Sequence, residues 1–202
     1  MNLIHLLAIF GLLSPVLYTI MWILGGFMDP EYSHIRQDVS SLVAVDAPNK
    51  KMLDTFLITS STLLFLFYIG LHWGINGGVG SVIGPVLFVI SGFLGVIVAI
   101  FCPLDAGGEL VTTRGKMHLV LISISGILTI AGMVALWFRL VSDSVWGDFA
   151  TFSLISAFFS LLFVIATSIS TKSGYMGLIE RFMVSTYQIY YFVLALMVFI
   201  TN

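Results

Sequence analysis

Six long hydrophobic runs, separated by polar segments, make up most of the chain. A helix needs about 20 apolar residues to cross the hydrocarbon core of a bilayer. Because backbone groups in lipid must be paired internally, and the runs are too long and too continuously apolar for barrel strands, they predict helices. The pattern predicts an all-α bundle of six transmembrane helices, forming a single integral membrane domain over residues 1–202. The predicted helices are Leu3–Met28, Met52–Ile75, Ser81–Pro103, Met117–Val141, Phe149–Thr171 and Phe182–Thr201.

The composition agrees with a membrane protein and narrows its partners. Hydrophobic residues make up 59% of the chain and charged residues only 9%, whereas a soluble domain carries about 25% charged residues. A formal net charge of −2 offers no basic surface for nucleic acid, so the expected partner is the lipid bilayer. The single cysteine, Cys102, excludes an internal disulfide and a multi-cysteine metal site. No Lys or Arg precedes the long first run, so we expect no cleaved signal peptide.

The polar connections alternate in length and charge. The second, Asn76–Gly80, and the fourth, Ser142–Asp148, are short, and Arg139 beside the fourth is the one basic residue outside the odd connections. By the positive-inside rule, the odd connections face the cytoplasm and both termini face outward across a plasma (inner) membrane. The alternation suggests three hairpins in series, either as a weak internal repeat or because Pro and Asp commonly end helices. The odd connections carry Arg36, Lys50, Lys51, Arg114, Lys116, Lys172 and Arg181.

Small and hydroxyl-bearing residues recur at helical spacing within the runs. Such residues let membrane helices approach closely and hydrogen-bond to one another. All four stripes can face the bundle interior, where they either support close packing or line a polar cavity. The stripes are Gly84, Ser91 and Gly95; Ser125, Thr129 and Gly132; Ser153, Ser156, Ser160 and Thr167; and Thr55, Thr59 and Thr62.

The longest polar stretch, residues 29–51, is called the first loop. Its apolar residues Val39, Leu42 and Val43 predict that part of it folds back as a short interfacial helix, with Asp38 as a cap. The loop is either a solvated connection or a segment that lines a site, since loops of this length are often functional. Its candidate ligand-binding residues are Tyr32, His34, Arg36, Asp38 and Ser40.

The third connection, residues 102–118, is called the third loop, and it also contains Glu109. Asp105 and His118 are the candidate catalytic residues, because an aspartate that orients a histidine makes a general base. Arg114 joins Arg36 as a candidate for binding a phosphate head group through the planar guanidinium fork. The alternative for His118 is an interfacial or helix–helix histidine satisfied by one hydrogen bond.

Metal and haem chemistry have little support in the motifs. If the odd loops share one end of the bundle, a zinc site would use His34, Asp38, Asp105 and His118, but no zinc motif supports it and no metal is predicted. No haem is expected, because His5 and His72 lie toward the opposite end from His34 and His118.

A nucleophilic site is also unmarked by any motif. Ser40, His118 and Asp105 make up a Ser–His–Asp set, but these residue types occur in most chains. The chain contains no HExxH, P-loop or nucleophile-elbow sequence.

Two segments carry a family resemblance. Residues 32–41 (YSHIRQDVSS) and 46–49 (DAPN) resemble the first loop of domain-of-unknown-function family 998, a family of small six-span prokaryotic membrane proteins. Residues 101–105 (FCPLD) and 115–118 (GKMH) are similar to its second hallmark, although here Cys102 separates Phe from Pro. The resemblance implies six spans and a prokaryotic inner membrane, and it implies no established activity. More loosely, the first loop resembles that of eukaryotic proteins involved in lipid-anchor remodelling, which implies a lipid-directed function.

The function expected from the sequence is binding or modification of a lipid or other amphiphile. The site would be formed by the first and third loops at the cytoplasmic interface. The alternatives are a small transporter, although no Asp, Glu, Lys or Arg lies in a helix centre, and a non-catalytic subunit or assembly factor.

Overall fold

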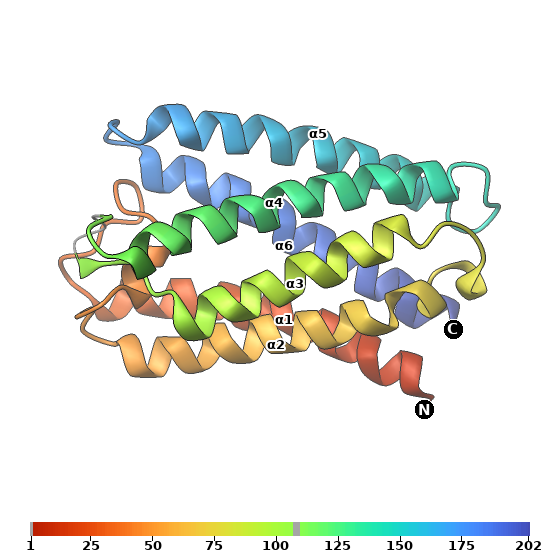
Figure 1. Ribbon diagram of the computed structural model, residues 1–202, viewed down its shortest axis with the longest axis horizontal. Helices are drawn as coiled ribbons and strands as arrows, with labels where there is room; N and C mark the ends of the chain where they lie inside the picture. Colours follow the sequence, from red (N-terminus) through yellow and green to blue (C-terminus); the bar gives the residue numbers. More distant parts are fainter. Residues whose placement is uncertain (1, 107–109) are drawn as a thin grey trace.

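The computed structural model describes residues 2–106 and 110–202 and contains six long α-helices in these ranges. Each helix is long and apolar enough to cross a membrane, which confirms the predicted all-α bundle. Both chain termini lie at one end of the bundle, and the first loop lies at the other end (Figure 1). The helices are α1 (Leu3–Met28), α2 (Lys50–Gly74), α3 (Ile83–Phe101), α4 (Thr113–Leu140), α5 (Gly147–Ser170) and α6 (Met176–Thr201).

The six helices form a closed ring. Each packs against its neighbours in sequence, and α6 completes the ring by packing against α1. The hairpins α1–α2, α3–α4 and α5–α6 are present, but α2 also packs on α3 and α4 on α5. The bundle is therefore one continuous unit, in which α6 is as closely associated with α1 as with its hairpin partner α5.

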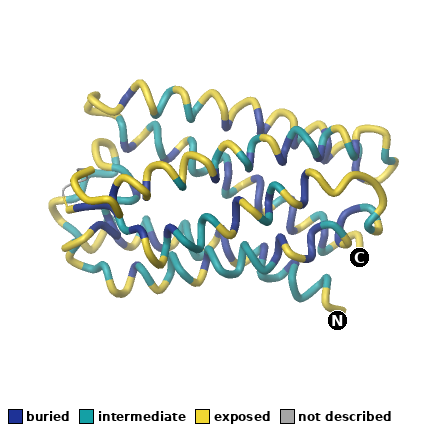
Figure 2. The backbone as a smooth tube through the Cα atoms, viewed as in Figure 1, coloured by how far each residue is buried: buried dark blue, intermediate teal, exposed yellow. Residues whose placement is uncertain are grey.

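Buried residues lie on the inward faces of the helices and exposed residues on the outward faces (Figure 2). The buried residues include hydroxyl side chains among large apolar ones, whereas large apolar residues are frequent on the exposed surface. The Ser91 hydroxyl on α3 is 2.8 Å from the Thr129 hydroxyl on α4, and Ser153 on α5 donates to the Met133 carbonyl at 2.9 Å. Phe138 is 70% exposed and Ile169 79% exposed. This distribution suits a lipid surrounding, because interhelical hydrogen bonds hold membrane helices together while apolar faces meet acyl chains.

One predicted stripe does not face the interior. Thr55 and Thr59 of α2 are exposed, and the buried hydroxyl residue of that helix is Ser60, which is 3% exposed. A threonine on a lipid-facing surface is tolerated because its hydroxyl bonds to the preceding turn, and Thr55 donates to the Lys51 carbonyl at 3.1 Å.

Helices α4 and α6 begin a full turn or more before the starts predicted from their apolar runs. Helix α4 starts at Thr113 rather than Met117, because the Thr112 hydroxyl accepts a hydrogen bond from the Gly115 amide at 3.1 Å and caps the helix. Helix α6 starts at Met176 rather than Phe182, and its polar first turns pack against the first loop. In α6 the charged residues Glu180 and Arg181 extend the helix because the first loop donates a hydrogen bond to Glu180 and accepts hydrogen bonds from Arg181.

Candidate functional site

The first loop crosses the end of the bundle from α6 to the third loop (Figure 1). The Leu178 amide of α6 donates to the Ile35 carbonyl at 3.0 Å, and the Val45 amide donates to the Leu104 carbonyl at 2.9 Å. Between these points lies a single 3-10 turn, η1 (Ser40–Val43). The Asp38 carboxylate accepts hydrogen bonds from the Ser41 amide at 2.6 Å and the Ser41 hydroxyl at 2.7 Å. The loop is thus anchored at both sides of the ring.

Arg181 of α6 is the main anchor for the first loop. Its side chain is 7% exposed, and Nη1 donates to the carbonyls of His34 at 2.7 Å and Gln37 at 3.0 Å. Nη2 donates to the Tyr32 hydroxyl, which in turn donates to the Asp38 carbonyl at 2.6 Å. Burial raises the pKa of Tyr32 to about 12, while Arg181 opposes this rise, so Tyr32 is neutral near pH 7. The guanidinium also lies over the Tyr32 ring, 5.5 Å from its centroid.

Glu180 adds a second contact between α6 and the loop. Its carboxylate accepts a hydrogen bond from the Val39 amide at 2.7 Å. Gly177, one turn earlier, lies directly beneath the Gln37 backbone, and a side chain there would collide with it. The sequence places Arg181 among the basic residues of the odd connections, at the same face as the candidate site, but predicts no contact between Arg181 and the first loop. The sequence signal for the anchoring role of Arg181 is a Glu–Arg pair directly before an apolar run. This signal is weak, because the sequence does not show which segment packs against the start of α6.

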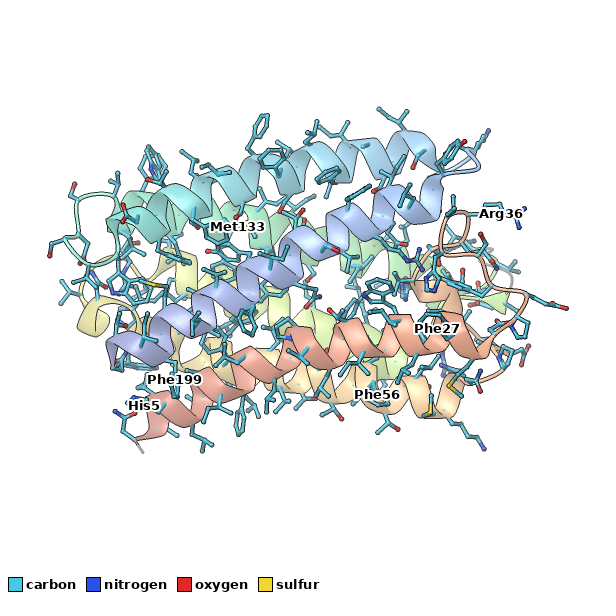
Figure 3. The ribbon with its side chains drawn as sticks, turned by 180° about the vertical axis from the view of Figure 1, so that it is seen from behind. His5, Phe27, Arg36, Phe56, Met133 and Phe199 are labelled. Carbon is cyan, nitrogen blue, oxygen red and sulfur yellow. The ribbon has the colours of Figure 1, made fainter. Side chains whose placement is uncertain are left out.

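His34 is packed among aromatic rings rather than directed at a metal. Its ring lies against Gly26 of α1 and makes edge contacts with Trp22 at 5.8 Å and Tyr32 at 5.3 Å. Burial lowers the pKa of His34, and the positive charge of Arg181 lowers it further. Figure 3 shows Phe27, another ring neighbour of His34, at the loop end of the bundle. His34 therefore supports the fold of the first loop.

Asp105 organises the entry to α4 and is not paired with His118. Its carboxylate accepts hydrogen bonds from the Thr112 hydroxyl at 2.6 Å and from the amides of Thr112 and Val111, each at 2.8 Å. These bonds, led by the Thr112 hydroxyl, lower the pKa of Asp105. Gly115 lies against the carboxylate and leaves no room for a side chain. In the part of the chain that the structure describes, Asp105 makes no hydrogen bond to His118, so the two candidate catalytic residues are not in direct contact.

His118 instead joins the first and third loops. Its Nδ1 lies 2.7 Å from the Cys102 carbonyl oxygen, and its Nε2 lies 3.1 Å from the Ser40 hydroxyl. The side chain is 8% exposed. The sequence reasoning singled out Ser40 and His118 but missed the Cys102 carbonyl, since any residue supplies a carbonyl and sequence carries no signal for it.

Two hollows adjoin the third loop, and Arg114 and Pro103 line both. The large hollow has a volume of about 630 Å³ and the small hollow about 220 Å³. The large hollow is lined by Val45, Pro103, Asp105, Ala106, Val111, Thr112, Thr113 and Arg114. The small hollow is lined by Lys50, Asp54, Ile58, Ala99, Ile100, Phe101, Pro103 and Arg114.

The predicted ligand-binding set is divided by this geometry. Arg36 lines neither hollow and projects at the edge of the bundle end (Figure 3). It follows Ile35, which is bonded to α6, whereas Arg114 begins α4. Lys50 borders the small hollow and pairs with Asp54 at 2.8 Å. The two arginines proposed to share a head group are therefore held by different elements.

The candidate metal set is not brought together either. Within residues 2–106 and 110–202, no group of three His, Cys, Asp or Glu side chains is placed to hold a metal ion. Three of the four candidate ligands are instead hydrogen-bonded to other groups. Asp38 accepts from Ser41, Asp105 accepts from Thr112, and His118 contacts the Cys102 carbonyl. Glu109, named with the third loop, lies outside the described residues.

The fold defines a multi-span membrane protein in which the first loop covers one end of the helix bundle. The profile of the family described as "Protein of unknown function (DUF998)" matches residues 12–197. The chain belongs to this family, as the resemblance in its two loops predicts. No curated protein matches the chain significantly, and no solved structure does.

Proposed function

We propose that the loop-covered end of the bundle binds an anionic amphiphile such as a phospholipid, with the head group at Arg114. The observation that carries the proposal is that Arg114 borders both hollows. Arg114 is exposed, and its guanidinium makes no hydrogen bond to another described residue. A planar guanidinium binds phosphate through two parallel hydrogen bonds.

The size and lining of the hollows support an amphiphile rather than a small polar solute. The volume of the large hollow, about 630 Å³, falls within the roughly 300–1,000 Å³ of small-molecule sites. Val45, Pro103 and Val111 supply apolar lining beside the polar Thr112. A ligand there would meet apolar and polar surface together.

The small hollow offers the route for an acyl chain. Its wall includes Ile100 and Phe101 at the end of α3, which are 45% and 63% exposed. Exposed apolar side chains of this helix would face lipid in a membrane. With its head group at Arg114, the ligand would place its acyl chain along α3. The acyl chain would then not pass through the bundle interior.

We further propose that this end faces the cytoplasm of a prokaryotic inner membrane. Arg181 is engaged with the first loop, but six other basic residues remain at this end, against Arg139 at the other. Arg139 itself is tied to the second connection through the Ile75 carbonyl at 2.9 Å. In a Cys102→Ala background, we expect Lys172→Cys to be shielded from an impermeant maleimide added to intact cells, and Val79→Cys to react. The reverse pattern would overturn this orientation.

The binding proposal is tested with fluorescent phosphatidylglycerol in detergent micelles. Arg114→Gln should weaken binding about tenfold, since a hydrogen bond to a charged group contributes about 1.5–3 kcal/mol. Arg36→Gln is the matched control and should bind like the wild type. Equal loss in both variants, or no loss in either, would contradict a site at Arg114. Solute flux through liposomes that is unaffected by Arg114→Gln would favour the transporter alternative.

A further inference from the structure

The side chains of Ser40 and His118 form a pair whose donor and acceptor are set by a third group. A carbonyl oxygen can only accept a hydrogen bond. The Cys102 carbonyl, 2.7 Å from His118 Nδ1, therefore places the proton of the neutral ring on Nδ1. Nε2 then presents a lone pair to the Ser40 hydroxyl 3.1 Å away, and the hydroxyl donates to it. A hydroxyl, an imidazole and an orienting acceptor in this series activate a nucleophile.

Ser40 is distinguished from the neighbouring Ser41 by its partner. The Ser41 hydroxyl donates to the Asp38 carboxylate at 2.7 Å, whereas the Ser40 hydroxyl meets the imidazole. The Val39 amide is fixed on Glu180 at 2.7 Å. The backbone is therefore held on both sides of Ser40, which keeps its hydroxyl directed at His118. Ser40 is half-buried and His118 almost fully buried, so the hydroxyl is the more accessible member of the pair.

Ser40 and His118 line neither hollow, but each is near in the chain to a residue that does. His118 follows Arg114 by one turn of α4, a spacing that places the two residues on neighbouring positions of the helix surface. Val45, which lines the large hollow, follows η1 and is tied to the third loop through Leu104. An ester group joined to a head group at Arg114 would reach the Ser40 hydroxyl if it extended about one turn along α4 toward His118.

We propose that Ser40 is the nucleophile of an acyl-transfer reaction on a carboxylic ester of a membrane lipid, with His118 as its base. The inference rests on the amphiphile site proposed above. Ser40 Oγ forms a bond to the ester carbonyl carbon while His118 Nε2 takes the hydroxyl proton. The ester C–O bond then breaks, and His118 returns the proton to the leaving alkoxide. Water resolves the acyl-Ser40 ester by the same proton path and releases a carboxylic acid.

The third member of the series is a neutral acceptor. In a Ser–His–Asp triad a carboxylate fixes the tautomer and stabilises the imidazolium that forms. Here the Cys102 carbonyl fixes the tautomer, and Asp105 is committed to Thr112. The neutral carbonyl stabilises the imidazolium less than a carboxylate would, so we expect slow turnover and a covalent adduct that is easier to detect than product.

The test uses a long-chain alkyl fluorophosphonate and intact-mass spectrometry of the full-length protein in detergent. We expect one adduct, mapped to Ser40, in the wild type and in Ser41→Ala, and none in Ser40→Ala. His118→Gln should slow labelling about 100-fold, since general-base catalysis contributes about 10²–10⁴. If His118→Gln fails to fold, Ser40→Cys and Ser41→Cys in a Cys102→Ala background replace it. Iodoacetamide should then alkylate position 40 at least tenfold faster than position 41.

The outcomes separate this inference from the binding proposal. Phosphatidylglycerol binding is measured on the same samples. If the protein binds phosphatidylglycerol but forms no adduct at Ser40, Ser40 is not a nucleophile, although the amphiphile site stands. Labelling that is equally fast in a folded His118→Gln variant leads to the same conclusion. Equal alkylation of the two cysteines also overturns the nucleophile. Labelling of Ser40 in a protein that does not bind the phospholipid supports the nucleophile and overturns the head-group site.

Discussion

His118 Nε2 lies 3.1 Å from the Ser40 hydroxyl, although the two residues are separated by 78 positions in the sequence. This contact joins the first loop to the start of α4, and the Cys102 carbonyl on the other ring nitrogen extends it to the end of α3. Three segments thus meet at one imidazole. The two stretches that carry the family resemblance are therefore parts of one structure.

Gly115 is required because the Asp105 carboxylate lies against it. In Gly115→Ala the new Cβ would displace a carboxylate that is held by three hydrogen bonds. Overpacking typically costs about 1–3 kcal/mol, so the variant should melt several degrees below the wild type in detergent. Gly95→Ala on α3, where an added Cβ meets nothing within 4 Å, is the control and should melt like the wild type. Equal melting of both variants would argue against the placement of Asp105.

Arg181 should determine whether the first loop stays ordered. Arg181→Met leaves the His34 carbonyl without its guanidinium donor and the Gln37 carbonyl with only the Tyr32 hydroxyl at 3.2 Å, and an unsatisfied buried group costs about 1–3 kcal/mol. We expect faster amide hydrogen exchange across residues 32–41. The matched control, Arg139→Met, removes an arginine that holds the Ile75 carbonyl at the opposite end. Its effect should be confined to residues 75–81, and slow exchange of the first loop in Arg181→Met would refute the anchor.

His34 should make the folded state sensitive to mild acid. Because burial and the charge of Arg181 lower the pKa of His34 in the fold, the unfolded chain binds a proton more readily. Stability contributed by neutral His34 is present above the ordinary pKa of about 6.5 and is lost as the pH falls below it. Thermal unfolding between pH 7.5 and 5.5 should therefore decline more steeply in the wild type than in His34→Asn. Parallel profiles would show that His34 has no such effect.

Much of the fold follows from the hydrophobic pattern, since burial in lipid makes each long apolar run a helix. The ends of α4 and α6 could not be predicted in this way. Residues 176–181 are helical because Gly177, Glu180 and Arg181 contact the first loop, and these contacts depend on the closure of α6 against α1. A closed ring is a tertiary property, and no periodicity within one helix encodes it.

The site was predictable in its residues but not in their pairing. Ser40, Asp105 and His118 are recognisable because they are polar residues beside apolar helices. Their partners depend on distances of less than one helical turn, which spacing in the sequence does not resolve. Asp105 bonds to Thr112 because the loop turns back at that point, and this leaves His118 to a backbone carbonyl. The sequence shows which residues are polar, whereas their hydrogen-bond partners are determined by how the loops fold.

The most direct test of the account is photoaffinity labelling with a phosphatidylglycerol that carries a diazirine close to the head group. We expect labels concentrated on residues 99–103 and near Arg114, the walls of the two hollows, and a severalfold loss of these labels in Arg114→Gln. Labelling of the outer face of α5, around the exposed Phe158, should be the same in both proteins. Labels spread evenly over the outer faces, with no change in Arg114→Gln, would contradict an amphiphile site at this end of the bundle.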